Sequence, residues 1–542
     1  MKSKFLLLSA LLIVILFNSC EKDDNLRIEP TPLVPTITGF IIPAKVVGDD
    51  SFNLTPPTSN SSGVFTYTSS NTAVATISDN TVTIVAEGTT TIKASQAANG
   101  NFLAGDISDD LVVTAQTTPV VGTLYVSTTG NDSNNGSKDS PFLTINKAAQ
   151  IAVAGDNVCI KSGTYKPTVV IKPANSGTEL APITYYAEEP GKAIIDGQSS
   201  IPTIASREGL FFVSGKSHIV IDGLRIINSG FFGILIKDNS SNVIVKNCST
   251  YNTGASGICG ANASFIKVLN NSVQRACIAP GGQSVRTSEC ITMASVNTFE
   301  VAYNTVFDRL VDVNNGGEGI DTKNACVNGK VHHNTVYDLI RVGLYIDSYK
   351  SALNNVEFYS NTVYNCSSGL NVACEEGGTN TNVKVYNNVI YNCPRVGIRL
   401  AGYLSDGAMY NISVYNNTVS KCGFGGGTWE NCGLLVEASN VLNTNFIVRN
   451  NIFSGNKIQM KTKNQSWLTL DNNLIFGAND ASGTGTNTII GDPLFVNALE
   501  NNFRLKAGSP AIDKALGTPK ALFDFTDFTR DATPDIGAFE YH

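Results

Sequence analysis

A repeated pattern of Asn and an apolar residue runs through the C-terminal half of the chain. Asn is followed two residues later by Val, Ile or Phe at positions that lie 22 to 34 residues apart. Repetition at a period of this size predicts a solenoid, in which each repeat packs on its neighbours. Stacked Asn side chains can bond backbone groups at turns, so we interpret them as architectural. The positions are Asn271, Asn304, Asn334, Asn361, Asn388, Asn417, Asn451 and Asn473.

A second marker, a small residue that opens an apolar run, alternates with the Asn pattern at intervals of 24 to 36 residues. Coils of a parallel β-helix stack at about 4.8 Å and tolerate insertions at their turns, so they fit this variation. A leucine-rich repeat would keep a tighter register. The predicted fold is therefore all-β, a right-handed parallel β-helix over residues 123–542. The marker positions are Gly233, Gly257, Cys290, Gly319, Gly343, Gly369, Gly397 and Gly433.

Both ends of the predicted solenoid carry distinct segments. Apolar residues at 145, 148, 149 and 152 have helical spacing, and we expect this helix to cap the first coil. Residues 491–496, 503–505, 508–513 and 535–541 resemble the C-terminal segment common in exported bacterial β-helix proteins. The resemblance implies a pectate-lyase-like solenoid with an N-terminal cap and a C-terminal closing segment.

A different pattern precedes the solenoid. Residues 34–116 alternate polar and apolar positions with period two, as in Thr81–Val85, between Ser, Asn and Gly turns. This pattern predicts a small β-sandwich. Tyr67–Asn71, Val74–Ile77 and Ala86–Ile92 resemble the bacterial immunoglobulin-like group-two domain. That resemblance implies an immunoglobulin-like spacer without chemistry of its own.

The N-terminus carries the pattern of an export signal. An apolar run from Phe5 to Phe17 follows Lys2 and Lys4 and is too short to span a membrane. Leu16–Cys20 resembles a bacterial lipoprotein cleavage site, which implies a signal peptide over 1–19, lipidation of Cys20 and a tether over 20–33. The acidic residues after Cys20 resemble a surface-sorting signal, so we expect an exported lipoprotein anchored in the outer membrane at the cell surface. An ordinary secretory peptide is the alternative.

Composition narrows the classes of function. With 42% hydrophobic and 15% charged residues the 542-residue chain is globular, and its net charge of −7 leaves no basic excess for nucleic acid. Eleven Cys remain after Cys20, an odd number without C-x-x-C pairs, which argues against a disulfide framework and a zinc site. We expect most of them to be small core residues.

Strand parity gives candidate functional residues. When the coils are aligned on the second marker, one outward column contains Asp321, Tyr345, Asn371 and Arg399. The next outward column contains Lys323 and Asp347. These side chains would form an exterior strip about 15 to 20 Å long, with Glu318 at its edge, which suits several units of a polysaccharide. Asn371 and Arg399 would bind substrate, although each residue could instead belong to a solvated face.

The segment Gly317–Lys323 resembles β-helical polysaccharide lyases, namely the chondroitinase B and alginate lyase group and the family-nine pectate lyases. The resemblance implies that Lys323 abstracts the C5 proton of a uronate and that Glu318 binds Ca²⁺. Asp308 and Asp312 would supply further oxygen ligands. Adjacent carboxylates raise the pKa of a Lys, however, so Lys323 could act as a base only if the metal neutralised them.

Two alternatives use the same strip. Asp321 and Asp347 lie on adjacent coils and could act as the acid and base of a glycoside hydrolase, with Glu375 and Glu376 as further choices. A surface protein on a spacer could also bind glycan without cleaving it. We expect a carbohydrate-active protein, with β-elimination preferred and with Tyr345, Asp321 and Asp347 assisting Lys323. Under that interpretation Lys323→Ala abolishes activity and leaves thermal unfolding nearly unchanged.

Overall fold

The computed structural model describes residues 32–47, 49, 51–114, 122–279, 289–310, 316–403, 406–425, 427–463, 465–478 and 485–542. The chain divides into a unit ending at Thr117 and a unit from Thr118 to the C-terminus. The predicted lipidation site Cys20 and the predicted ligand Asp312 lie outside the described residues. Within the described ranges, no helix is both long enough and apolar enough to cross a membrane.

The first unit consists of short β-strands around one apolar core. A four-stranded sheet, β2-β9-β8-β5, and a three-stranded sheet, β3-β7-β6, both contribute to the core, which includes Val82, Ile92 and Leu111. The period-two pattern therefore forms a β-sandwich, because alternate side chains of each strand point inward. The strands are β1 (Ile37–Thr38), β2 (Lys45–Val46), β3 (Phe52–Asn53), β4 (Thr58–Ser59), β5 (Phe65–Ser69), β6 (Ala75–Ser78), β7 (Thr81–Ile84), β8 (Gly88–Gln96) and β9 (Gly105–Thr114).

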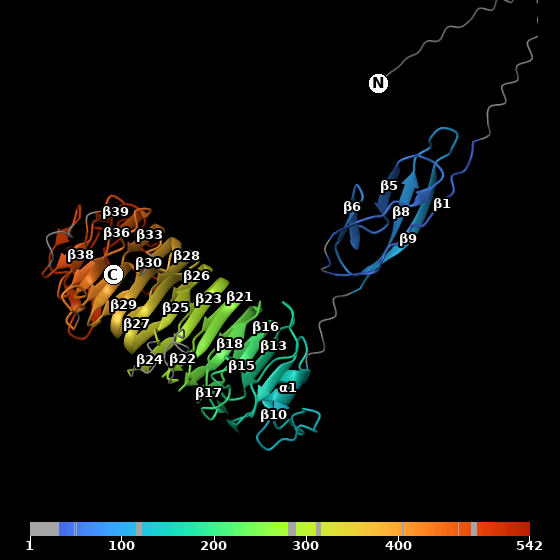
Figure 1. The fold of residues 1–542 in the computed structure, drawn as a ribbon. Helices are drawn as coiled ribbons and strands as arrows, with labels where there is room; N and C mark the ends of the chain where they lie inside the picture. The colour runs from blue at the N-terminus through green and yellow to red at the C-terminus, as the bar shows by residue number, and fades with distance from the viewer. Residues whose placement is uncertain are drawn as a thin grey trace, which may run out of the picture. The chain divides into compact units, whose positions relative to one another are not determined.

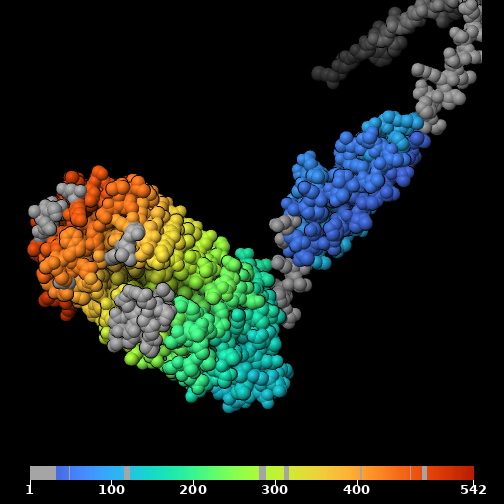
Figure 2. All heavy atoms as spheres, in the orientation of Figure 1, coloured from blue at the N-terminus to red at the C-terminus, as the bar shows by residue number. Residues whose placement is uncertain are grey.

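The second unit is a solenoid of parallel strands (Figure 1). Within the described residues, 32 strands from β10 to β41 form one continuous parallel sheet that winds through three faces, which we call A, B and C. Figure 2 shows the colours changing steadily along the solenoid, so consecutive coils are neighbours in space. The predicted parallel β-helix is confirmed. The predicted helix is α1 (Ile145–Ile151), which lies beside β10 and β11 and is capped by the Thr144 side chain.

Face A carries the predicted site residues. It contains β15 (Gly209–Ser214), β18 (Phe232–Lys237), the first parts of β21 (Ile258–Leu269) and β23 (Ile291–Ala302), β25 (Ile320–Lys323), the last parts of β27 (Thr335–Tyr349) and β29 (Thr362–Glu375), β32 (Val396–Tyr403), β35 (Cys432–Val436) and β38 (Met460–Thr462). The register pairs Asp321 with Tyr345, Tyr345 with Asn371, and Asn371 with Arg399. The predicted outward column is thereby confirmed.

Faces B and C complete each coil. Face B contains β10 (Thr123–Val126), β11 (Asn157–Ile160), β13 (Ile183–Ala187), β16 (Ser217–Asp222), β19 (Ser241–Lys246), the last parts of β21 and β23, β26 (Val327–His332), β28 (Ala352–Tyr359), β30 (Thr379–Tyr386), β33 (Met409–Tyr415), β36 (Thr444–Arg449) and β39 (Leu468–Asp471). Face C contains β12 (Gly163–Tyr165), β14 (Ala193–Asp196), β17 (Arg225–Ile227), β20 (Ser249–Tyr251), β22 (Ser272–Gln274), β24 (Thr305–Arg309), the first parts of β27 and β29, β31 (Val389–Tyr391), β34 (Thr418–Ser420), β37 (Ile452–Ser454), β40 (Leu474–Phe476) and β41 (Ile489–Ile490).

The repeated Asn residues form a buried ladder. The backbone N–H of Asn334 donates to Oδ1 of Asn361 at 3.0 Å, and Nδ2 of Asn361 donates to the carbonyl of Val331 at 3.0 Å. The same pattern joins Asn361 to Asn388. Each Asn is buried and satisfies backbone groups at a turn, which confirms an architectural role.

The remaining core follows the sequence pattern. The eleven Cys after Cys20 are all buried, as expected of small core residues. After β42 (Phe495–Asn497) and β43 (Asn502–Leu505), the C-terminal segment packs apolar residues such as Ile536 against Val389, Ile452 and Leu474 of face C. This segment therefore covers the flank of several late coils.

Candidate active site

Lys323 lies at the centre of a buried group of carboxylates. Its Nζ is 2.6 Å from Oε1 of Glu289, 3.1 Å from Oδ2 of Asp321 and 4.0 Å from Oδ2 of Asp347. We call these four residues the carboxylate cluster. β25 supplies Asp321 and Lys323, β27 supplies Asp347, and Glu289 immediately precedes the small residue that opens the face A part of β23. The cluster therefore joins three consecutive coils.

The predicted strip is outward-facing, but the expectation that it lies on the exterior is wrong for most of its members. Asp321 is 0% exposed, and Asp347, Asn371 and Tyr345 are also buried. The burial of Asp321 follows from its charged neighbours. The Lys323 side chain lies against Asp321 and forms an ion pair with Glu289 from the preceding coil. The outward position in a β-helix column thus does not guarantee contact with water.

The cluster changes the acidity of its members. Burial lowers the pKa of Lys323, but the charges of Asp321, Glu289 and Asp347 outweigh it and raise the pKa well above its ordinary value. Burial raises the pKa of Asp321 well above its ordinary value against the opposing charge of Lys323, and it raises the pKa of Glu289. Burial and the neighbouring Glu375 raise the pKa of Asp347 to about 7. Lys323 is therefore a cation at neutral pH, whereas Asp347 exchanges a proton there.

A second group of charges lies beside the cluster. Nε and Nη2 of Arg341 donate to Oε1 of Glu318 at 3.0 and 2.8 Å. The Tyr345 hydroxyl donates to Oε1 of Glu375, at the end of β29. Glu375 follows Asn371 of the Asp321–Arg399 column by four residues along β29, and this bond joins it to that column.

Arg399 belongs to a network of ion pairs on the next coils. Its Nη1 lies 2.8 Å from Oε1 of Glu430, and its guanidinium also pairs with Glu437. Glu430 pairs with Arg395 as well. Arg395, Arg399 and Glu430 line a pocket of about 330 Å³, which we call the Arg pocket. Its polar lining residues are Glu318, Arg341, Tyr345, Ser367, Ser368, Asn371, Glu375, Arg395, Arg399 and Glu430.

Asn371 has a polar atom without a partner among the described residues. Its side chain lines the Arg pocket and is 3% exposed, yet Oδ1 accepts no hydrogen bond from any described group. A buried polar atom without a partner is costly, so such atoms often mark a place where a ligand or water binds. Asn371 was predicted to bind substrate from its column alone, and its position in the pocket fits that prediction.

Two of the three expected calcium ligands have other partners, and the third, Asp312, lies outside the described residues. Nε and Nη2 of Arg341 both bind Oε1 of Glu318, and Asp308 on β24 of face C accepts a hydrogen bond from Nε2 of Gln274 at 2.9 Å. The described residues contain no group of three or more His, Cys, Asp or Glu suited to hold a metal ion. Because the guanidinium of Arg341 already occupies the carboxylate of Glu318, which Ca²⁺ would need as a ligand, we derive no chemistry through calcium.

Some site residues escaped the sequence prediction. Glu289 escaped it, although it stands one residue before the marker of its coil, as the predicted Glu318 does. Glu430 had no such signal, because it lies in the long segment between Gly397 and Gly433 where no repeat position is defined. Arg341 lies two residues before the next marker, Gly343, and no sequence signal indicated that it would pair with Glu318.

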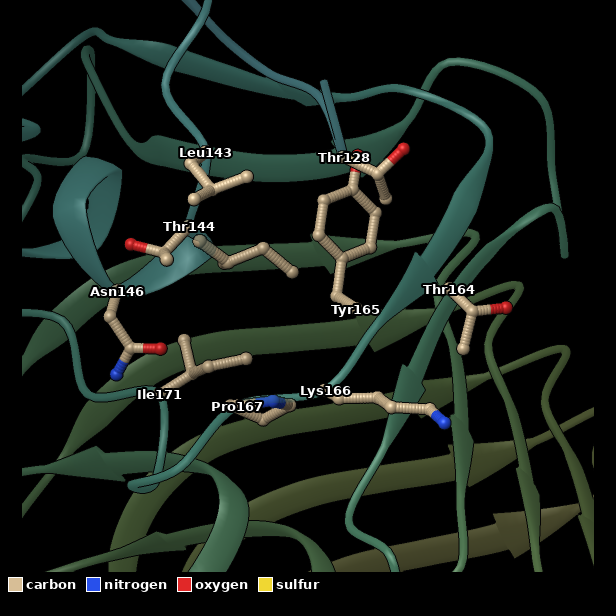
Figure 3. A pocket seen from close by; sticks show the side chains of 10 residues that line it. Thr128, Leu143, Thr144, Asn146, Thr164, Tyr165, Lys166, Pro167 and Ile171 are labelled. Carbon is tan, nitrogen blue, oxygen red and sulfur yellow. The ribbon is translucent and has the colours of Figure 1, made fainter. Parts of the chain in front are cut away.

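Two other pockets lack a comparable group of buried acids. A pocket of about 260 Å³ lies near the first coil, where Leu143, Tyr165 and Ile171 turn toward the same space (Figure 3). It contains no carboxylate, and its phenol is bound to backbone carbonyls. A groove of about 640 Å³ on face B brings Phe265, Lys267 and Glu300 together but has no cluster of buried acids. We therefore regard the carboxylate cluster and the Arg pocket as the candidate active site.

Comparisons with known proteins agree with the fold. A family model described as a Pel9A-like right-handed beta helix region matches residues 124–277. The uncharacterized protein YwoF of Bacillus subtilis is 35% identical over 130 residues, 23% of this chain and 27% of that protein. Pectate lyase PEL9 of Emericella nidulans is 32% identical over 127 residues, 22% of this chain and 31% of that protein. The chain thus spans less than a third of the length of these curated relatives.

A solved structure shows the same fold, and a second family model covers more of the chain. The solved structure of pectate lyase Pel9A matches with a TM-score of 0.50 and 16% identity, covering 78% of this chain and 96% of that one, which shows a common fold. A model described as a right-handed beta helix region matches residues 203–379 and 328–492, together more than half of the chain. The chain therefore belongs to the right-handed β-helix family.

Proposed function

We propose that this protein is a carbohydrate-active enzyme that hydrolyses a glycosidic bond with carboxylic acids of face A. The observation that carries the proposal is the position of Lys323 among three carboxylates, beside an Asp347 whose pKa is about 7. A carboxyl group with a pKa near neutrality can be protonated before the reaction and lose its proton during it, as a general acid requires.

Burial distinguishes the two Asp residues that the sequence paired. Their Oδ2 atoms lie 3.1 and 4.0 Å from the same Nζ, so they are at most about 7 Å apart, which is no farther apart than the carboxyl groups of inverting glycosidases can lie. The side chain of Asp321 is completely buried, however, whereas that of Asp347 retains some exposure. We therefore assign proton donation to Asp347 and an electrostatic role to Asp321.

Glu375 is the partner carboxylate in this proposal. It is half-buried, lines the Arg pocket and accepts the Tyr345 hydroxyl. In hydrolysis the proton of Asp347 passes to the glycosidic oxygen as the bond breaks, and Glu375 takes a proton from the water that attacks the anomeric carbon. The products gain the elements of one water molecule, with Asp347 left as carboxylate and Glu375 as acid until they re-equilibrate.

Elimination is the second candidate. The relatives include proteins named pectate lyases, and the sequence of residues 317–323 resembles lyases. Two observations place it second. The Pel9A-like match ends at residue 277, before the first member of the carboxylate cluster, and the charges of the neighbouring acids raise the pKa of Lys323 well above its ordinary value, which disfavours the neutral amine that a base needs.

The test uses the chain from residue 25 onward and a panel of pectate, alginate, glycosaminoglycans and uncharged glycans. New reducing ends and the absorbance of unsaturated uronate are measured on each reaction. Hydrolysis predicts reducing ends without absorbance, while a rise in absorbance would establish the lyase instead. Retained binding without either product would indicate a glycan-binding protein.

By the same proposal the enzyme works at the cell surface, attached through a lipid on Cys20 to the outer membrane. The support is the residue order Leu16–Cys20 and the acidic residues that follow it. Mass spectrometry of the N-terminal peptide tests this directly, since a diacylglyceryl group on Cys20 is expected. Release of the wild-type chain without lipid would contradict the anchor and leave the proposed reaction unaffected.

A further inference from the structure

We infer that the candidate active site takes an uncharged stretch of glycan and discriminates against uronates. The inference rests on the proposed function, because it names the substrate class of that site. It starts from the partners of the basic residues, since a protein that recognises a sugar carboxylate needs a cation free to meet it.

The described cations that line the Arg pocket are already paired. Arg341 is bound by Glu318, and Arg395 and Arg399 share Glu430, with Glu437 as a further partner of Arg399. A uronate carboxylate would have to compete with protein carboxylates that already hold these cations, and the side chains of Glu318 and Glu430 are only 8% and 18% exposed. Such an exchange leaves one buried charge without a partner, which is unfavourable.

The balance of charge is equally unsuited to an anion. Seven described carboxyl groups face four cations across the carboxylate cluster and the Arg pocket. With Asp321 and Glu289 protonated, as their raised pKa values favour, and with Asp347 protonated as a general acid must be, four carboxylates remain beside four cations. Lys323 is enclosed by three of these acids, so it cannot serve a substrate carboxylate. The site therefore offers an anionic glycan no net positive charge.

The pocket does offer partners for hydroxyl groups. Oδ1 of Asn371 accepts nothing from the described residues, and the hydroxyls of Ser367 and Ser368 lie on the same lining. Glu375 provides a further acceptor. A neutral sugar presents several hydroxyl donors at such positions without bringing a charge that must be neutralised. The substrate class that fits is therefore an uncharged hexose or pentose polymer.

The experiment compares polysaccharides that differ only in charge. Polygalacturonate, alginate and glucuronoxylan are each paired with their carboxyl-reduced forms, and binding of the chain from residue 25 onward is measured by affinity electrophoresis and calorimetry. We expect at least one reduced form to bind about tenfold more tightly than its acidic parent. Equal or tighter binding of all acidic parents, or no binding of any reduced form, would overturn the inference.

A pair of variants makes the test specific to the Arg pocket. Glu430→Gln releases Arg395 and weakens the hold on Arg399, so it should improve binding of the acidic forms several-fold. Glu357→Gln is the control, because Glu357 pairs with Lys384 on face B, has nearly the same side-chain exposure, and lines no part of the Arg pocket. Gain of acidic binding in both variants, or in neither, would contradict the proposed role of these ion pairs.

The two proposals fail in different ways. Tight binding of acidic glycans with hydrolysis that still requires Asp347 would remove the inference and keep the proposed function. Selective binding of uncharged glycans without any cleavage would remove the proposed function and keep the inference.

Discussion

Oε1 of Glu289 and Nζ of Lys323 lie 2.6 Å apart, although 34 residues separate them in the sequence. The pair joins one coil to the next on face A and holds Lys323 over the fully buried Asp321. A Lys in such surroundings holds the site together by neutralising acids. It is not placed to lose its proton to solvent at neutral pH.

Replacement of Lys323 should destabilise the fold. Lys323→Met leaves three buried acids without their shared cation, and we expect a loss of about 3 kcal/mol in the free energy of unfolding at pH 8. The loss should shrink at pH 5, because acids whose native pKa is raised take up protons that the unfolded chain binds only near pH 4. Urea unfolding at the two pH values measures this.

The exposed Lys330 provides the control, since Lys330→Met should change the unfolding free energy by less than about 0.5 kcal/mol. An unchanged unfolding curve for the Lys323 variant with loss of all activity would instead support the lyase mechanism expected from the sequence.

Asp347 should control the pH dependence of catalysis. Its pKa is raised to about 7, so the protonated acid is present below that pH and is lost as pH rises through it. The rate should therefore fall on the alkaline side of neutrality. Asp347→Asn should lower kcat by about 10²- to 10⁴-fold. Asp338→Asn, in the part of β27 where Asp338 accepts a hydrogen bond from Nδ2 of Asn365, should retain the wild-type rate.

Removal of divalent metal should leave the reaction intact. Glu318 is engaged by Arg341, and the described residues form no carboxylate group suited to Ca²⁺. We expect activity in excess EDTA to stay within about twofold of the untreated protein, because no step of the proposed hydrolysis needs a metal. If activity is lost in EDTA and only Ca²⁺ restores it, the result would support the calcium site expected from the resemblance to lyases.

The Asn ladder should contribute strongly to stability. Asn361→Ala removes the acceptor of the Asn334 N–H and the donor to Val331 in a site that is 0% exposed. We expect a loss of about 2 to 4 kcal/mol, since several buried backbone groups lose their partners. Asn382→Gly is the control: this Asn belongs to an exposed row and has φ of 55°, which Gly adopts easily. Chemical denaturation of both variants compares them.

Strand register was predictable because parity and the repeat markers act locally. One marker per coil sufficed to place Asp321, Tyr345, Asn371 and Arg399 in a single column, and the structure pairs them in that order. Their environment was not predictable in the same way. Burial and ionisation depend on side chains from other segments, above all Glu289 and Glu430, whose approach no periodic rule describes.

Lys323 shows the difference between predicting the position of a residue and predicting its environment. Its place in the column followed from the sequence, and the sequence also warned that neighbouring acids would oppose a basic role. Only the distances to Glu289 and Asp321 decide between the alternatives, because the strength of a charge interaction depends on separation and burial.

The Asn ladder keeps the same geometry in coils of different length. Asn388 and Asn417 are 29 residues apart, and Asn417 and Asn451 are 34 apart, yet the ladder bonds that join them measure 3.0 and 2.9 Å. Extra residues in a coil are thus accommodated outside the ladder, as in the segment that carries Glu430. Lengthening or shortening such a segment can give the same scaffold a new specificity without any repacking of its interior.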